Sequence, residues 1–429
     1  MKNDRRSFLK MSTAAGAGLA LSATSGLVAP ASAKVKVNAT PIDKLQNMMG
    51  GVEPITLQER MNRIEKAKRL MRENNIDAIY LEGSSNLEYF TGVTWGRSER
   101  MMAAIIPQKG EVKYICPMFE ADRLREKIIF GDDVRGWEEH ESPYKHVAQM
   151  FKDMGINNGT IGIGERTRFF LFDGIRKEAP HLTFVSADPV TIPCRLYKSK
   201  HELALLQKAN DITIEAYKTS VSMIEAGMTA PDIRDITRAA HAKMGVYGTI
   251  YAQVGIVSSS PHGLLVEPEV EDGIIVLMDG GCTVHGYESD ISRTFVHGTH
   301  TDEQKRVWDL ERKAQQAGFE AAQLGAPLEN VDIAARKVIT DAGYGPEYKT
   351  PGLPHRTGHG IGLDGHEWGN AVLGNKTPLA PGMCFSIEPM IAIPGKFGVR
   401  LEDVCYMTED GPRWFTQPSV AIDDPFGNN

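Results

Sequence analysis

The stretch HRTGHGIGLDGHE, residues 355–367, decides the fold, because it lies between two acidic segments that complement it. The first acidic segment, IIVLMDGGCTVHGYESDISRTF, precedes it at residues 274–295, and the second follows it at residues 382–404. Together the three segments offer one imidazole and four carboxylates: His359, Asp279, Asp290, Glu388 and Glu402. Carboxylate oxygens with a single imidazole suit a pair of divalent cations. We expect the rest of the chain to be a scaffold that brings these five side chains together.

A β-hairpin is expected to place each pair of carboxylates. Asp279 ends an apolar run, and Asp290 follows eleven residues later on a returning strand, after glycine-containing turn signals. Glu388 and Glu402 repeat this pattern around a turn at residues 394–395. Facing strands hold paired side chains within a few ångströms, so each pair can bridge two cations. Four carboxylates that face one another in a core would be very costly without cations, and this cost predicts a metal site.

Each motif taken alone has an ordinary structural explanation. A single aspartate at the end of a strand is usually a turn residue, and the segment GHGIG at residues 358–362 could be a tight loop. It is not a phosphate-binding loop, because it lacks the Gly-Lys-Ser/Thr ending. The five side chains in this order are far more specific than any one of them, so the metal-site hypothesis depends on the whole set.

The composition is that of an ordinary globular protein large enough for two domains. The chain has 429 residues, of which 41% are hydrophobic and 24% are charged. A formal net charge of -7 gives no support for nucleic-acid binding. The five cysteines include no CxxC pair, which argues against both a thiolate zinc site and a disulfide framework.

Residues 1–33 have the features of a twin-arginine signal peptide. The motif RRSFLK at residues 5–10 is followed by a weakly apolar segment and by Ala31-Ser32-Ala33, a small-residue cleavage site. Ser, Thr and Gly interrupt the apolar segment, so stable membrane insertion is not expected. The alternatives are an uncleaved anchor and a chance arginine pair. We expect the twin-arginine export machinery to deliver the folded chain to the periplasm, with cleavage near Ala33.

Two domains are expected after this leader. Residues 34–55 have the composition of an irregular lead-in. In residues 56–190 short apolar runs alternate with helical patterns, which favours a small α/β domain. A segment with two prolines at residues 188–198 is expected to be a linker. Long helical patterns and antiparallel hairpins in residues 199–429 predict an α+β domain.

The chain resembles the pita-bread metallopeptidases, which include methionine aminopeptidase, aminopeptidase P and prolidase. The ligand order of that family, Asp, Asp, His, Glu, Glu, falls on the five side chains named above. The Pro-His-Gly segment of prolidase-like members matches residues 261–263, and the second histidine of the family matches His366 in DGHE. The resemblance covers nearly the whole chain after the leader. It implies a C-terminal pita-bread catalytic domain preceded by a smaller creatinase-like N-terminal α/β domain, and this N-terminal domain favours the Xaa-Pro branch over methionine aminopeptidase.

The resemblance implies metal-assisted hydrolysis with two divalent metal ions. Mn2+ is the first expectation, with Co2+, Zn2+ and Fe2+ as alternatives. Glu388 is implied as the group that takes a proton from the attacking water, and His262 and His366 as donors of hydrogen bonds to the reacting oxygen. Three further side chains are expected to contact substrate: His355, Arg400 and Trp95.

Two of these substrate contacts have alternatives. Arg400 could pair with an acidic ligand instead of a substrate carboxylate. Trp95 belongs to a segment that relatives place near the active site of a partner subunit, so its contact would form across a homodimer. Ordinary packing of Trp95 in its own domain is the alternative.

The sequence thus predicts an exported, dinuclear-metal-dependent peptidase that hydrolyses Xaa-Pro bonds at peptide N-termini or in dipeptides. One alternative is a hydrolase or lyase of a small non-peptide substrate, similar to ectoine hydrolase-like or dimethylsulfoniopropionate lyase-like relatives, because substrates vary on one fold. Another is a non-catalytic peptide-binding module. Five intact ligands argue against that second alternative.

Overall fold

The computed structural model describes residues 40–427. The expected signal peptide at residues 1–33 and the start of the lead-in lie outside the described residues. The rest of the lead-in is not wholly irregular, as the sequence suggested, because helix α1 (Pro41–Lys44) forms in it. Thr40 and Asp43 make a capping box, and a proline opens the helix, which together stabilise this single turn.

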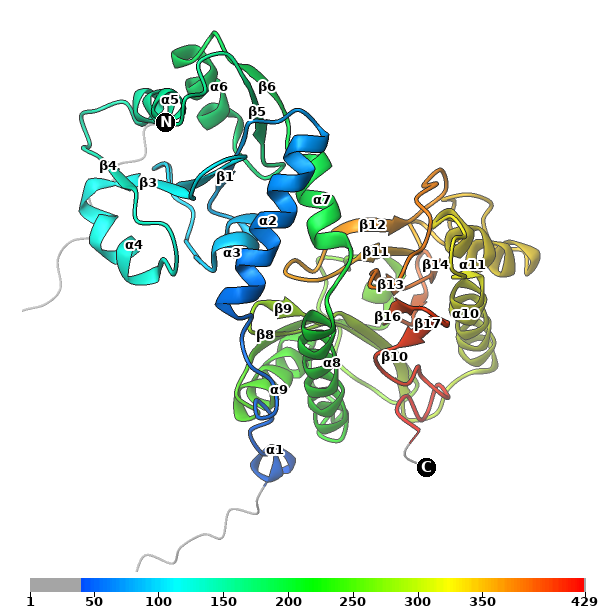
Figure 1. The fold of residues 1–429 in the computed structure, drawn as a ribbon. Helices are drawn as coiled ribbons and strands as arrows, with labels where there is room; N and C mark the ends of the chain where they lie inside the picture. Colours follow the sequence, from blue (N-terminus) through cyan, green and yellow to red (C-terminus); the bar gives the residue numbers. More distant parts are fainter. Residues whose placement is uncertain (1–39, 428–429) are drawn as a thin grey trace, which may run out of the picture. The chain divides into compact units, whose positions relative to one another are not determined.

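Six strands form a mixed sheet in the N-terminal part of the described chain (Figure 1). Their order is β4-β3-β2-β1-β5-β6. Their bounds are Ala78–Glu82 for β1, Ala103–Pro107 for β2, Lys113–Pro117 for β3, Val134–Trp137 for β4, Thr160–Ile163 for β5 and Thr183–Ser186 for β6. Strand β2 runs antiparallel to both of its neighbours, and the other pairs are parallel. The α/β character expected for this part is confirmed.

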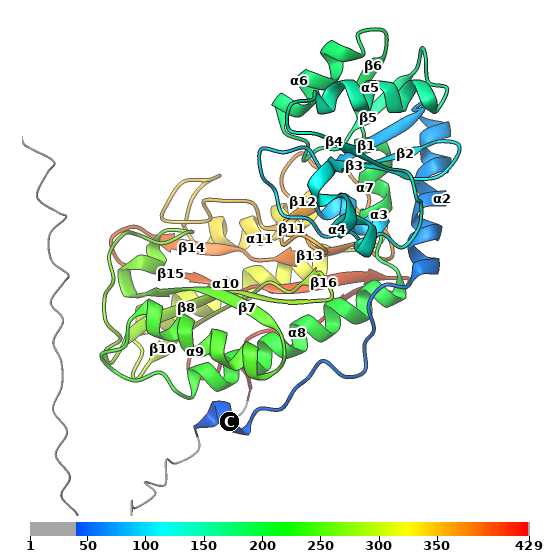
Figure 2. The same cartoon turned by 90° about the vertical axis from the view of Figure 1, so that its left-hand side faces the viewer.

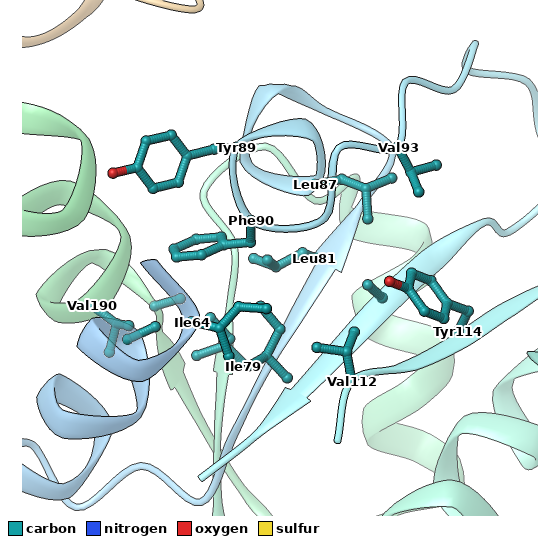
Figure 3. Close-up of a cluster of buried hydrophobic side chains, with 14 of the residues drawn as sticks. Ile64, Ile79, Leu81, Leu87, Tyr89, Phe90, Val93, Val112, Tyr114 and Val190 are labelled. Carbon is teal, nitrogen blue, oxygen red and sulfur yellow. The ribbon is translucent and has the colours of Figure 1, made fainter. Parts of the chain in front are cut away.

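Helices cover both faces of this sheet. One core contains residues of α2 (Leu57–Glu73), α3 (Ser85–Thr91), α4 (Ala121–Lys127) and α7 (Asp188–Leu196), and the other contains residues of α5 (Pro143–Asp153) and α6 (Phe169–Glu178). Strand β1 divides its residues between them, with Ile79 in the first core and Tyr80 in the second, as the two-residue period of a strand requires. Figure 3 shows the first core, where Ile64 of α2 and Val190 of α7 gather around Ile79.

The prediction of a linker at residues 188–198 is wrong, because most of these residues form helix α7. Two prolines suggested an irregular segment, but Pro189 stands in the first turn, where no N–H donor is needed, and Pro193 is accommodated inside the helix. Val190 and Cys194 of this helix are buried in the first core. Burial of its apolar side therefore outweighs the helix-breaking tendency of Pro193.

The C-terminal part holds three antiparallel sheets. Strands β7 (Tyr247–Val254), β8 (Ile274–Val284) and β10 (Ile291–His297) lie in the order β10-β8-β7, with β9 (Tyr287–Glu288) also on β8. A five-stranded sheet has the order β12-β11-β13-β16-β17, with bounds Glu367–Ala371, Gly358–Gly360, Cys384–Ile387, Asp403–Thr408 and Gly411–Trp414. A ribbon pairs β14 (Met390–Ile393) with β15 (Phe397–Arg400).

Four long helices complete this part: α8 (Lys200–Val221), α9 (Ala230–Lys243), α10 (Asp302–Ala321) and α11 (Glu329–Asp341). Helices α8 and α9 pack against β7 and β8 (Figure 2), and α10 packs against α11 and the ribbon. The α+β class expected for this part is confirmed. Within residues 40–427, no helix combines the length and apolar character needed to cross a bilayer.

His241 of α9 is buried beneath β7, with its ring against Gly248. A side chain on Gly248 would collide with this ring, which explains a glycine at the second position of the strand. Burial lowers the pKa of His241 to about 4, because desolvation disfavours the imidazolium form. Between that value and 6.5, the unfolded chain binds a proton at this residue and the folded chain does not.

We predict that His241 alone costs the folded protein about 2 kcal/mol of stability as the pH falls from 7 to 5. The loss has this sign because only the unfolded state takes up the proton in that range. Urea unfolding at the two pH values measures it. His241→Leu is expected to shrink the pH-dependent difference by that amount, and His181→Leu, at an exposed position, is expected to leave it unchanged. An identical pH dependence in wild type and His241→Leu would contradict this account.

Candidate metal centre

All five candidate ligands line one cavity of about 440 Å³. Asp279 lies in β8 and His359 in β11, whereas Asp290 precedes β10, Glu388 follows β13 and Glu402 precedes β16. Two groups of three contain only these ligands, and the ligand atoms within each group lie within 4.8 Å of one another: His359 with Glu388 and Glu402, and Asp279 with Asp290 and Glu402. A third group, at the same spacing, joins Asp290 and His359 to His366. The structure therefore brings together the side chains that the sequence motifs singled out.

Ser292 of β10 links the two acidic segments. Its hydroxyl oxygen lies 2.7 Å from Asp279 Oδ1 and 2.8 Å from Glu402 Oε2. Ser292 pairs with Asp279 in the β8–β10 ladder and with Glu402 in an isolated bridge, so the two sheets meet at this residue. Ser292 was not among the residues predicted from the sequence, although its position two residues after Asp290 was a usable signal.

Glu388 and Glu402 meet from opposite strands of one long hairpin. The β13–β16 ladder stops at the pair Ile387–Asp403, and the β14–β15 ribbon begins beyond the two glutamates. The turn expected at residues 394–395 is present at the tip of this ribbon. The glutamates therefore occupy the gap between two ladders, rather than positions within a strand.

His359 enters the cavity from β11, where flanking glycines let the neighbouring strands come close. A side chain on Gly358 would collide with the backbone of Ser386, and one on Gly360 would collide with the strand on the other side. His359 Nδ1 lies 3.1 Å from the Gly360 carbonyl oxygen. The other ring nitrogen, Nε2, lies 3.1 Å from Glu388 Oε1, so Nε2 is the atom offered to a cation.

The buried carboxylates perturb one another strongly. Burial and the charge of Asp279 raise the pKa of Asp290 to about 7. Burial and the charge of Asp290 raise the pKa of Glu402 well above its usual range. Burial alone would also raise the pKa of Glu388, but the adjacent His359 lowers it overall. The raised values show how unfavourable this cluster is as a set of bare anions.

This donor set fits divalent cations. Glu402 Oε1 is buried and has no hydrogen-bond partner among the described residues, which leaves a carboxylate oxygen free beside the cavity. Carboxylate oxygens and a single imidazole are suitable ligands for such cations. Bound cations would neutralise the acids and keep them deprotonated.

Arg400 is paired with the acidic cluster. Its guanidinium forms an ion pair with Asp279 and donates from Nε to Ser292 Oγ at 3.0 Å. It also donates to the Pro261 carbonyl oxygen at 3.3 Å. Of the two roles that the sequence left open, the structure shows the pairing with an acidic candidate ligand. A contact between Arg400 and a substrate carboxylate stays a prediction.

Three histidines surround the candidate ligands. The ring of His366 lies against that of His359, with centroids 3.9 Å apart, and burial lowers the pKa of His366 to about 4. Arg356 NH2 lies 3.1 Å from His366 Nδ1, so the neutral imidazole carries its proton on the other nitrogen. His355 lines the same cavity, and its buried Nε2 has no partner among the described residues. His262 lines the cavity from an exposed position.

Trp95 does not line this cavity within its own chain. It packs against the first N-terminal core, and the Arg123 guanidinium lies 5.5 Å from its ring centre. Packing is therefore what the structure shows for Trp95. The expectation that it contacts substrate across a homodimer stays a prediction.

An ion-pair network holds the loop that carries His366. Arg195 pairs with both Asp364 and Glu367, and Lys198 pairs with Glu367 at 3.0 Å. Both cations come from the segment that was expected to be a linker, so nothing in the sequence connected them with the site. The network fixes the loop on both sides of His366 and keeps its ring beside His359.

Sequence comparisons agree with this geometry. Residues 204–409 match metallopeptidase family M24, and residues 63–197 match the creatinase/prolidase N-terminal domain. The Xaa-Pro dipeptidase of Lactobacillus helveticus is 34% identical over 360 residues, which cover 82% of this chain and 96% of the relative. The Xaa-Pro dipeptidase of Pyrococcus furiosus is 29% identical, over 83% of this chain and 97% of the relative.

Solved structures share both parts of the fold. Dipeptidase PepE from Mycobacterium ulcerans superposes with a TM-score of 0.80 at 27% identity, covering 87% of this chain and 100% of that one. The X-Pro aminopeptidase from Thermotoga maritima superposes with a TM-score of 0.74 at 27% identity, covering 84% of this chain and 99% of that one. The similarity therefore extends over the N-terminal sheet as well as the candidate metal centre.

Divalent cations are predicted to stabilise the protein against thermal unfolding. A cation at a hundred times its Kd adds about 2.7 kcal/mol, which raises Tm by roughly 5 °C in a domain of this size. Calorimetry of chelator-treated protein, with and without Mn2+, measures the rise. Asp290→Asn is expected to remove most of it, and Asp302→Asn, at an exposed helix start, is expected to keep it. An undiminished rise in Asp290→Asn would place the cation elsewhere.

Proposed function

Because the chain belongs to metallopeptidase family M24 and carries a creatinase/prolidase N-terminal domain, we propose that it hydrolyses Xaa-Pro bonds in dipeptides and at peptide N-termini. The observation that carries this proposal is the convergence of five candidate ligands on one cavity. The relatives from Lactobacillus helveticus and Pyrococcus furiosus, which are Xaa-Pro dipeptidases, support the choice of bond. We propose residues 56–190 and 199–429 as the bounds of the two domains.

Two divalent cations complete the site in this proposal, held by Asp279, Asp290, His359, Glu388 and Glu402. Mn2+ is our first choice because carboxylate oxygens dominate the donor set, with Co2+, Zn2+ and Fe2+ as alternatives. When bound, the cations supply Lewis-acid polarisation of the scissile carbonyl and lower the pKa of a water molecule.

Different side chains of the cavity then transfer the proton and stabilise the developing charge. Glu388 accepts a proton from the attacking water and passes it towards the leaving amine. His366 and His262 donate hydrogen bonds to the oxygen that gains negative charge. His355 accepts a hydrogen bond at Nε2 from bound substrate, because its Nδ1 donates to the Arg356 carbonyl oxygen at 2.7 Å and burial, which lowers its pKa, keeps the imidazole neutral. The lack of a partner for Nε2 within the described chain supports this role.

The assay of the Mn2+-loaded protein on Ala-Pro tests this proposal. We predict release of proline, with no cleavage of Ala-Ala. His366→Asn is expected to lower kcat/KM by about 10²-fold, because a donor to the developing charge is lost. His181→Asn, at an exposed position in the N-terminal part, is expected to retain full activity. Cleavage of N-acyl amino compounds without any cleavage of Xaa-Pro peptides would overturn the assignment in favour of a non-peptide substrate.

We also propose that the protein acts in the periplasm as a homodimer. The RRSFLK motif and the small residues before Lys34 support export by the twin-arginine route. The dimer is supported by the family resemblance, and a monomeric mass in light scattering would contradict it.

Replacement of both arginines of the motif, Arg5→Lys with Arg6→Lys, is predicted to leave the protein in the cytoplasm. Cell fractionation with immunodetection measures the distribution, and Lys2→Arg serves as a control that keeps a charged leader. Equal export of the double variant and the wild type would refute the twin-arginine route.

A further inference from the structure

A second cavity continues from the candidate metal centre along β7. It has a volume of about 560 Å³ and shares four functional side chains with the first cavity: His262, Asp279, Asp290 and His366. The two cavities are therefore parts of one continuous hollow. An Xaa-Pro dipeptide spans only about 7 Å when extended, so the second cavity offers room that a dipeptide centred on the cations does not fill.

Two tyrosines of β7 line this second cavity. Tyr247 and Tyr251 are 74% and 73% exposed, although most large aromatic side chains of the described chain are at least partly buried. Between them Gly248 and Ile250 point the other way and are buried, as the alternation of a strand requires. Both phenol rings therefore lie on the face that carries the acidic cluster. Such open aromatic rings beside a cavity are typical of a ligand-binding wall.

The register of β7 fixes how far each tyrosine lies from the reaction. Tyr251 pairs directly with Asp279 of β8, so it stands beside the candidate metal centre. Tyr247 lies four residues further along the same face, about 13 Å away at the rise of a β-strand. That distance corresponds to about four residues of an extended peptide.

The direction of the bound peptide follows from the proposed function, on which this inference rests. Cleavage of an N-terminal Xaa-Pro bond leaves a single residue on the amino side of that bond. Any additional residues must then follow the proline. Tyr247 is therefore within reach only of the residues that come after proline in a substrate longer than a dipeptide.

We propose that Tyr247 and Tyr251 form the wall that binds the segment following proline in oligopeptide substrates, and that the protein favours aromatic side chains at the third and fourth positions. Aromatic rings in offset or edge contact gain enough free energy for a two- to tenfold preference. The proposal adds to the proposed function a preference for oligopeptides that carry aromatic side chains after the proline.

The test compares three peptides on the full-length, Mn2+-loaded protein: Ala-Pro, Ala-Pro-Ala-Ala and Ala-Pro-Phe-Phe. The wild type is expected to cleave Ala-Pro-Phe-Phe with a kcat/KM two- to tenfold above that for Ala-Pro-Ala-Ala. Tyr247→Ala is expected to abolish this preference and to leave Ala-Pro within twofold of wild type. Tyr247→Phe keeps the ring and is expected to keep the preference. Phe169→Ala removes a ring of matched exposure, 72%, outside the cavity and is the control.

The outcomes separate the two proposals. Failure to cleave any of the three peptides would overturn the proposed function and this inference with it. Cleavage of Ala-Pro alone would leave the dipeptidase part of the proposed function standing and overturn the inference. An unchanged Phe-Phe preference in Tyr247→Ala, with the variant melting at the wild-type temperature, would also overturn the inference. Loss of the preference in Tyr247→Ala but not in Phe169→Ala would support it.

Discussion

The mutual repulsion of carboxylates held inside one cavity is the constraint on which the C-terminal part of this structure depends. Burial and a neighbouring anion raise the pKa of Asp290 to about 7 and raise the pKa of Glu402 well above its usual range. A chain gains nothing from assembling such a cluster as bare acids, since desolvation opposes each charge. His359 and Arg400 offset part of this cost, and divalent cations would offset the rest.

The fold meets this constraint by bringing two hairpins and strand β11 to one place, with Asp279 and His359 inside strands and the other candidate ligands next to strand ends. Ser292 joins the β8–β10 hairpin to the end of the β14–β15 ribbon, where Glu402 lies. Glycines at positions 358 and 360 allow β11 to pass close enough for His359 to complete the cluster. The N-terminal part contributes through Arg195, whose ion pairs hold the loop that carries His366. Four separate regions of the chain thus contribute to the site, three with candidate ligands and one with Arg195, which holds a loop in place.

The features that could be predicted from sequence are those specified by neighbouring residues. Helix α2 begins where Thr56 and Glu59 make a capping box, and the two acidic hairpins follow from apolar runs and glycine turns. The five candidate ligands were predicted from the acidic hairpins and the segment GHGIG, and the ligand order of the family that the chain resembles matched all five. Strand β4 gives no such local signal, because its sequence, VRGW, has no clear alternation and its burial is partial.

What could not be predicted depends on contacts between residues far apart in the chain. Helix α7 contains Pro193 and forms because its apolar side is buried against the N-terminal core. Arg195 has no local signature of function, and its importance appears only when the sheets and loops are assembled. The ion pair between Arg400 and Asp279 likewise could not be predicted, because it forms only when the fold brings their two strands together.

The most direct test of the metal account is the divalent-cation content of the full-length protein, measured by elemental analysis after dialysis against Mn2+ and removal of free metal. The account predicts two equivalents per chain in the wild type, and fewer than two in Glu402→Ala with a parallel loss of Ala-Pro hydrolysis. A protein that retains no cation, yet hydrolyses Ala-Pro at the same rate in the presence of a strong chelator, would contradict it.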